Sequence, residues 1–129
     1  MKPTTDDIVE INQILSLWAH LVDNHAWDRF GDVFTEDAHF DSSVFGFAPV
    51  TGIAAICHMA SQDGHAKARH TTNVYVQEGA GNELVAVSKG LGLLPSGAVA
   101  SVTYTDRLRR TPEGWRLASR ILALQAPSH

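Results

Sequence analysis

The period of the hydrophobic pattern changes partway along the chain, and this change restricts the possible folds more than any other feature. Apolar residues near the N-terminus recur at three- and four-residue steps: Ile8, Ile11, Leu15, Trp18 and Val22. This spacing gathers them into one buried stripe on an α-helix. The second half of the chain alternates between apolar and polar residues instead, as strands do. We therefore expect helices first and a sheet afterwards.

Three helical segments and four long strands are predicted. The first helix is expected over residues 6–26, with Thr4 or Thr5 as its N-cap. A short second helix, an extended stretch and a third helix ending at Met59 follow it. The long strands are expected in four segments, which are 67–79, 82–94, 98–110 and 115–125.

This order of elements indicates an α+β fold. A curved antiparallel sheet wrapped around the N-terminal helices makes a cone-shaped α+β barrel with an internal cavity, which suits a small apolar or cyclic organic ligand. The chain has 129 residues and shows neither an internal repeat nor a linker, so we expect a single domain over residues 1–129.

Composition and short motifs exclude several functions. A net charge of −4 argues against nucleic-acid binding. No apolar run is long enough to span a membrane, and no apolar signal segment is present at the N-terminus. The single cysteine, Cys57, fits a reducing compartment, so we expect a cytoplasmic protein. The histidine spacing and the scattered glycines match no metal or dinucleotide motif, so no metal and no cofactor are expected.

Asp23 and His70 are the candidate catalytic pair. Asp23 lies at the end of the first helix, and His70 shares its parity in the first long strand with Thr72, Val74 and Val76. Because this parity carries apolar residues, we expect His70 to face the interior. A carboxylate that orients an imidazole leaves the other ring nitrogen free for general acid/base chemistry. The alternative is a helix-end aspartate and a strand histidine with structural roles only.

Aromatic residues are the second candidate group. Trp18 and Phe40 lie near Asp23 in the sequence, and Tyr104 lies in the third long strand. These side chains are expected to line an apolar pocket or to fill the core. On the outer face of the sheet, exposed apolar residues predict a homo-oligomer, a dimer or a trimer.

Three segments follow one another along the chain, "WDRFGDVFTEDA", "RHTTNVYV" and "RTPEGWRLASR". Through these segments and their order, the chain resembles the SnoaL-like family of the NTF2-like superfamily over residues 6–124. The similar branch contains scytalone dehydratase, the bile-acid 7α-dehydratase and the hexachlorocyclohexane dehydrochlorinase. The resemblance implies the cone-shaped fold and a cofactor-free enzyme, most simply a dehydratase or other lyase. It also leaves open a ketosteroid-isomerase-like isomerase, a polyketide-type cyclase and a binding protein without catalysis.

The resemblance also assigns residues. Asp23 and His70 occupy the positions of the family's catalytic dyad. Trp18 stands where several relatives keep a tyrosine or lysine, and Phe40 and Ser42 lie near a position at which the dehydratases have a tyrosine. Arg120 lies near an arginine that faces the pocket of the dehydrochlorinase, and a solvated Arg120 is the alternative. The expected substrate-binding residues are therefore Trp18, Phe40, Ser42, Tyr104 and Arg120.

Overall fold

The first helix begins where the sequence supplies a cap. The Thr4 hydroxyl accepts a hydrogen bond from the Asp7 backbone N–H at 3.1 Å, and the Asp7 carboxylate accepts one from the Thr4 N–H at 2.9 Å. In the computed structural model, which describes residues 1–125, this helix is α1 (Thr5–Asp23). All but one of the residues of the predicted stripe are buried, and the exception is Ile8.

A six-stranded sheet follows α1, in the order β2-β1-β6-β5-β4-β3. All neighbouring strands are antiparallel except β1 and β6, which are parallel. Two parallel neighbours need a long connection between them, and β1 and β6 meet this condition because they are the first and the last strand of the chain. The bounds of the strands are β1 (Phe34–Asp41), β2 (Val50–Thr51), β3 (Ala68–Glu78), β4 (Glu83–Leu93), β5 (Val99–Thr111) and β6 (Gly114–Leu124).

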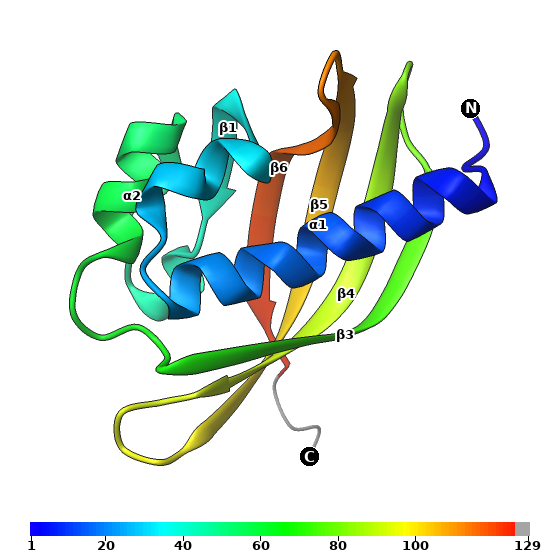
Figure 1. Cartoon of the computed structure of the whole chain (residues 1–129). Coiled ribbons are helices and arrows are strands. Elements are labelled where there is room, and N and C mark those ends of the chain that lie inside the picture. Colours follow the sequence, from blue (N-terminus) through cyan, green and yellow to red (C-terminus); the bar gives the residue numbers. More distant parts are fainter. Residues whose placement is uncertain (126–129) are drawn as a thin grey trace.

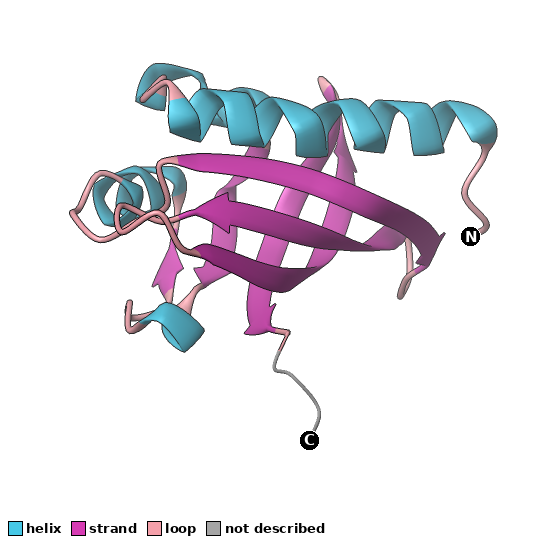
Figure 2. Ribbon diagram, turned by 90° about the horizontal axis from the view of Figure 1, so that it is seen from below, coloured by secondary structure: helices cyan, strands magenta, loops and turns pink. Residues whose placement is uncertain are grey.

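Three short helices complete the structure. The 3₁₀-helix η1 (Trp27–Asp32) leads into β1, the single turn η2 (Ser43–Phe45) follows β1, and α2 (Ile53–Ala60) precedes β3. α1 lies across one face of the curved sheet, and α2 lies beside β1 at one end (Figures 1 and 2). Among residues 1–125, no helix is long and apolar enough to cross a membrane.

These elements confirm the predicted α+β class, with N-terminal helices packed against a curved sheet. Two details differ from the expectation. The sheet contains one parallel pair, and it stays open with β2 and β3 as its edges instead of closing into a barrel.

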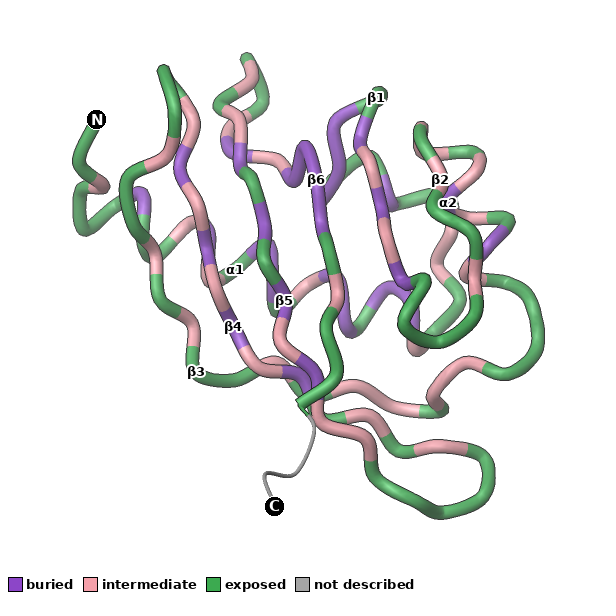
Figure 3. The backbone as a smooth tube through the Cα atoms, turned by 180° about the vertical axis from the view of Figure 1, so that it is seen from behind, coloured by how far each residue is buried: buried purple, intermediate pink, exposed green. Residues whose placement is uncertain are grey.

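The core fills the space between α1 and the inner face of the sheet. Buried and less buried residues alternate along β4 and β5 (Figure 3), as expected for strands with one face inward. Trp115, Leu117 and Leu108 are fully buried where β5 and β6 meet. The core therefore fixes the curvature of the sheet beneath α1.

Strand β3 contains a bulge that reverses its alternation. Its pairing with β4 shifts between Thr72 and Tyr75, and Asn73 has a positive φ of 55°. An extra residue in the left-handed conformation exchanges the two faces of a strand, and asparagine tolerates this conformation better than most residues. Val74 and Val76 therefore pack on the core, whereas before the bulge the odd-numbered residues face inward.

Candidate functional site

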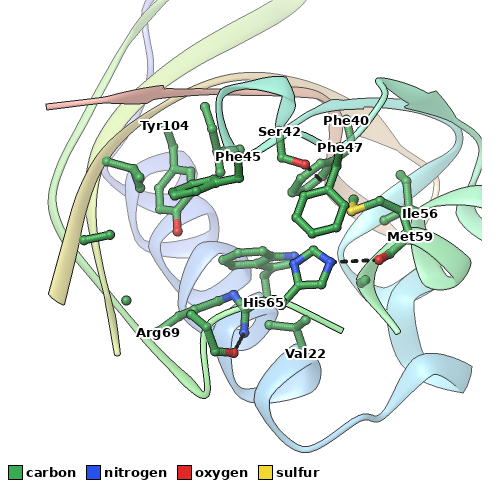
Figure 4. Close-up of a pocket in the computed structure, with 18 of the residues that line it drawn as sticks. Val22, Phe40, Ser42, Phe45, Phe47, Ile56, Met59, His65, Arg69 and Tyr104 are labelled. Carbon is green, nitrogen blue, oxygen red and sulfur yellow. Dashed lines mark hydrogen bonds between the residues drawn. The ribbon is translucent and has the colours of Figure 1, made fainter. Parts of the chain in front are cut away.

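A largely apolar cavity lies between α1, the sheet and α2. It has a volume of about 70 Å³. Figure 4 shows the side chains that surround it. α1 contributes Trp18 and Val22, α2 contributes Ile56 and Met59, and the loop after α2 contributes His65. This volume is small beside the ~300–1,000 Å³ of pockets for larger ligands, so the cavity suits a small molecule.

Small residues in the sheet leave room for the cavity. Gly92 and Ala100 are paired across β4 and β5, and both line the cavity. Gly90 leaves the space that the Tyr104 ring takes: a Cβ atom at Gly90 would lie 2.4 Å from Cε2 of Tyr104. A side chain at Gly90 would overlap with the Tyr104 ring, and a larger side chain at Gly92 or Ala100 would reduce the volume of the cavity.

Asp23 is bound by Arg69. The Arg69 backbone N–H donates to Oδ2 of Asp23 at 2.9 Å, and Nη1 donates to Oδ1 at 2.8 Å. Nη1 also donates to the Ala66 carbonyl at 3.2 Å. The two side chains are only 11% and 21% exposed, for Arg69 and Asp23 respectively. This ion pair therefore joins the end of α1 to the start of β3 in a partly dry environment, and Arg69 lines the cavity.

The structure does not form the expected contact between Asp23 and His70. His70 is exposed and is not among the residues that line the cavity. The physical reason is the bulge at Asn73: Val74 and Val76 do face inward, but His70 lies before the bulge, on the opposite face. Arg69, its neighbour, takes the inward position beside Asp23.

His65 is the histidine that lines the cavity. Its Nε2 lies 2.8 Å from the Met59 carbonyl oxygen. Because a carbonyl only accepts hydrogen bonds, Nε2 carries the proton, and Nδ1 keeps its lone pair. Burial lowers the pKa of His65 below its ordinary value, the bond to Met59 opposes this shift, and the nearby Arg69 charge adds to it. His65 is therefore held as a neutral imidazole of fixed tautomer.

Tyr104 and Trp18 also line the cavity. Their rings meet edge to face with centroids 5.6 Å apart. Figure 4 shows the Arg69 side chain below Tyr104 and His65, on the side of α1. Burial raises the pKa of Tyr104, although the positive charges of Arg120 and Arg69 oppose this shift. Tyr104 therefore keeps its proton at neutral pH and can donate it in a hydrogen bond.

Arg120 does not line the cavity. It is fully buried, and its Nε and Nη2 donate to the two carboxylate oxygens of Asp106, each at 2.8 Å. Its guanidinium carbon lies 4.5 Å from the Trp18 ring centroid and 4.0 Å from that of Tyr104. The expectation that Arg120 contacts a ligand is therefore wrong. Arg120 packs behind Trp18 and Tyr104 and supports these two residues of the cavity wall.

The remaining predicted site residues lie on the cavity wall. Phe40 packs against Trp18 with ring centroids 6.2 Å apart. Ser42 also lines the cavity, and its hydroxyl lies 3.7 Å from the sulfur of Met59. Trp18 and Tyr104, described above, are the other two.

Sequence reasoning missed His65 and Arg69. His65 lies in the loop after α2, where no periodic pattern indicates an orientation. Arg69 has the opposite parity to His70, so the expectation that His70 faces the interior places Arg69 on the outer face. The asparagine of "RHTTNVYV" is the one sequence signal that could have revealed the bulge and hence the inward face of Arg69.

A metal is not suggested by the arrangement of the side chains. Within the described part of the chain, residues 1–125, no three His, Cys, Asp or Glu residues come together in a group that could hold an ion. The polar side chains on or beside the cavity are a histidine, a tyrosine, a serine and an Arg–Asp pair, which can hydrogen-bond a ligand and exchange protons with it.

The curved sheet, the helix across it and the enclosed cavity define a domain of the NTF2-like class. More narrowly, the family model of the SnoaL-like domain matches residues 3–121, so the chain belongs to this family. The resemblance seen in the sequence is therefore confirmed. A comparison with curated proteins gave no match.

Solved structures share the fold. A protein of Novosphingobium aromaticivorans proposed as an aromatic ring hydroxylase is 28% identical, with a TM-score of 0.81 over 96% of this chain and 92% of its own. A proposed scytalone dehydratase from the same organism is 16% identical, with a TM-score of 0.76 over 95% and 89%. A hexachlorocyclohexane dehydrochlorinase of Novosphingobium barchaimii is 15% identical, with a TM-score of 0.74 over 90% and 84%.

Proposed function

We propose that this protein is a cofactor-independent enzyme that removes a proton from a carbon atom of a small, mostly apolar cyclic molecule, as a lyase of the dehydratase type. The observation that carries the proposal is His65, a neutral imidazole in an apolar cavity with its Nε2–H fixed on the Met59 carbonyl. The unprotonated Nδ1 is then free to accept a proton at neutral pH.

The elimination uses the two sides of the cavity. Nδ1 of His65 takes the proton from carbon, the electron pair of the C–H bond forms a double bond, and the bond from the adjacent carbon to oxygen breaks. The Tyr104 hydroxyl donates a proton to the departing oxygen, which leaves as water. The proton held by His65 then returns to Tyr104 through solvent, so both groups regain their starting state.

The Asp23–Arg69 pair supplies the polar part of this site. Among residues 1–125, Nε and Nη2 of Arg69 have no hydrogen-bond partner, while Nη1 and the backbone N–H are used by Asp23 and Ala66. The free N–H groups can stabilise negative charge that develops on the substrate or on the Tyr104 oxygen. Asp23 holds the guanidinium in place and acts as a positioning residue.

The relatives support a cyclic substrate. The similar proteins include a proposed aromatic ring hydroxylase, a proposed scytalone dehydratase and a dehydrochlorinase. An isomerase or cyclase would use the same base without loss of a group, and the mass of the product separates these reactions. A binding protein without chemistry is the second candidate, and it would hold its ligand in the same cavity.

A model elimination tests the base. The probe 5-nitrobenzisoxazole opens when a base removes its ring proton: the N–O bond breaks and a coloured cyano-nitrophenolate forms. We expect the protein to accelerate this opening, and we expect His65→Ala to lower kcat/KM by about 100-fold or more. His70→Ala is the matched control and should act like the unchanged protein.

The same experiment distinguishes His65 from the Asp23–His70 pair as the catalytic group. If His70→Ala lost the activity and His65→Ala kept it, the Asp23–His70 pair implied by the family resemblance would replace His65 as the catalytic group. If the unchanged protein gave no acceleration over buffer, the binding function would be favoured instead.

A further inference from the structure

Phe47 stacks on His65 at the cavity. The two rings are nearly parallel, with an interplanar angle of 10° and centroids 4.1 Å apart. Both residues line the cavity, and Figure 4 shows the Phe47 ring above His65, beside Met59 and Phe40. One face of the proposed base is therefore covered by an aromatic ring of the chain itself.

The segment that carries Phe47 is weakly tied to the rest of the fold. Residues 47–49 belong to no helix or strand, and they make no backbone hydrogen bond within residues 1–125. Gly46 precedes Phe47 with a φ of 90°, a conformation that favours glycine. Phe45, in the preceding turn η2, is 39% exposed. Side-chain packing is thus the main contact that holds Phe47 in place, and such segments open at low cost.

His65, in contrast, is fixed. Its Nε2 is bound to the Met59 carbonyl at 2.8 Å, and this bond involves no atom of residues 42–49. If Phe47 moved away, the imidazole would keep its orientation and present a bare face to the cavity. A flat, apolar place would open there, bounded by Phe40, Ile56 and Met59.

The volume of the cavity also indicates that a ligand ring needs the space that Phe47 occupies. An apolar cavity of about 150 Å³ takes up benzene in another protein. The cavity in this structure has about half of that volume, about 70 Å³. A six-membered ring therefore needs more room than the closed arrangement offers, and the space of the Phe47 ring supplies it without any change in the sheet or in α1.

We infer that Phe47 holds the place of the ligand: a planar, uncharged aromatic or conjugated ring stacks on His65 in the position of the Phe47 ring, and Phe47 turns outward on its segment to admit it. This inference rests on the proposed function in that it takes His65 as part of the ligand site. Because the lone pair of Nδ1 lies in the plane of the imidazole, the ring that stacks on His65 is a flat part of the ligand, and the carbon that loses its proton belongs to an adjoining part that reaches the edge of the imidazole. The inference goes further than the proposed function, because it requires a flat ring in the ligand. A saturated ring is puckered and cannot lie against the imidazole at stacking distance.

Phe47 therefore sets the selectivity of the site. In the unchanged protein, a ligand must compete with Phe47 for the His65 face, so its apparent affinity is reduced. Removal of the Phe47 ring should improve the binding of a flat ring of similar size. The gain should be small for a saturated ring, which recovers apolar contact but no stacking.

The test uses benzyl alcohol and cyclohexylmethanol, two neutral alcohols of similar size that differ in the flatness of the ring. Binding to the full chain and to Phe47→Ala is followed by the NMR signals of the His65 ring protons, which His65→Ala identifies by their loss. We expect Phe47→Ala to bind benzyl alcohol about three- to tenfold more tightly than the unchanged protein does, and to prefer it to cyclohexylmethanol.

The position of the NMR signals gives a second readout. The ring current of a stacked aromatic ring moves the His65 signals upfield. Phe47→Ala should lose this displacement, benzyl alcohol should restore it, and cyclohexylmethanol should leave it absent. Val44→Ala, a change in the preceding turn η2 at a side chain that does not line the cavity, should behave like the unchanged protein.

Two results would overturn the inference: equal binding of the two alcohols to Phe47→Ala, or weaker binding of benzyl alcohol to Phe47→Ala than to the unchanged protein. Neither result depends on turnover, so the base function of His65 is judged separately by the opening of 5-nitrobenzisoxazole. A folded Phe47→Ala is verified by an unchanged circular dichroism spectrum. Phe47→Leu, which keeps apolar bulk without a flat ring, should bind benzyl alcohol less tightly than Phe47→Ala does, because the leucine side chain still occupies part of the place of the ring.

Discussion

At the scale of single residues, the partner of Asp23 on β3 is the neighbour of the residue that the sequence suggests. His70 has the side chain expected of a catalytic partner for Asp23, but Arg69 makes the contact, with two hydrogen bonds of 2.9 and 2.8 Å. One position along a strand changes the face of the sheet, so a correct residue type on the wrong face contributes nothing to a cavity. The partner of Asp23 is therefore an arginine.

The Asp23–Arg69 contact can be measured as a coupling. We expect a double-mutant cycle of Asp23→Ala and Arg69→Ala to give a coupling of about 1–3 kcal/mol in the free energy of unfolding, because the pair is largely buried and hydrogen-bonded. The cycle of Asp23→Ala with His70→Ala is the matched control and should give a coupling near zero. Urea unfolding provides the measurement, and a larger coupling with His70 than with Arg69 would contradict the assigned contact.

At the scale of elements, the β3 bulge separates what sequence patterns could predict from what they could not. The bounds of α1 and of the four long strands lie close to the predicted ranges, because both patterns arise from local spacing. The parity of Val74 and Val76 was also interpreted correctly. The extension of this parity back to His70 was wrong, since alternation holds only along an unbroken ladder and the extra residue at Asn73 breaks it.

The other errors at this scale come from long-range contacts. The parallel pairing of β1 with β6 joins residues about eighty positions apart, and no local pattern encodes it. The burial of Arg120 depends on Asp106, its partner on the adjacent strand, and on two aromatic rings from other elements. Residue types and spacing predict the layers of the fold, whereas the contacts between side chains of different elements depend on the register of the strands.

The left-handed conformation of Asn73 in the bulge leads to a testable prediction. Asn73 has a φ of 55°, which glycine adopts freely and β-branched residues avoid. We expect Asn73→Val to lower the free energy of unfolding by about 1–2 kcal/mol. Asn73→Gly should leave it nearly unchanged. Chemical denaturation of the two variants side by side measures the difference, and equal stabilities would show that the left-handed conformation is not required at this position.

At the scale of the whole molecule, Asp7 connects the start of α1 to the hairpin of β5 and β6. In addition to its capping role, its Oδ1 accepts hydrogen bonds from Nε1 of Trp115 at 3.0 Å and from Nη2 of Arg110 at 2.8 Å. The side chain is 4% exposed. The hydrogen bond from the Thr4 backbone is the main cause that lowers the pKa of Asp7 below 3.8. The bonds from Trp115, Thr4 and Arg110 add to this effect, and burial opposes it.

This carboxylate links global stability to pH. Because the pKa of Asp7 is lower in the folded state, the unfolded chain binds more protons at acid pH. The stabilisation is therefore present above the ordinary value of 3.8 and is lost as the pH falls through the folded pKa. We expect Asp7→Asn to cost about 1–3 kcal/mol at neutral pH and to weaken the loss of stability between about pH 5 and pH 2.

Urea unfolding followed by tryptophan fluorescence measures the effect of Asp7→Asn at each pH. Asp6→Asn is the matched control, because Asp6 is an exposed neighbour in the same helical turn. An unchanged acid dependence in Asp7→Asn, or an equal effect of Asp6→Asn, would show that the link between α1 and the hairpin does not govern acid stability.

The central claim is that His65 is the neutral base of the cavity, with its proton fixed on Nε2 by the Met59 carbonyl. Long-range proton–nitrogen NMR spectra of the His65 ring, recorded over a pH series, test it most directly. The account predicts the Nε2–H tautomer at neutral pH and a protonation midpoint below the ordinary value of 6.5, because burial and the Arg69 charge disfavour the charged ring. An Nδ1–H tautomer, or a midpoint at or above 6.5, would contradict it.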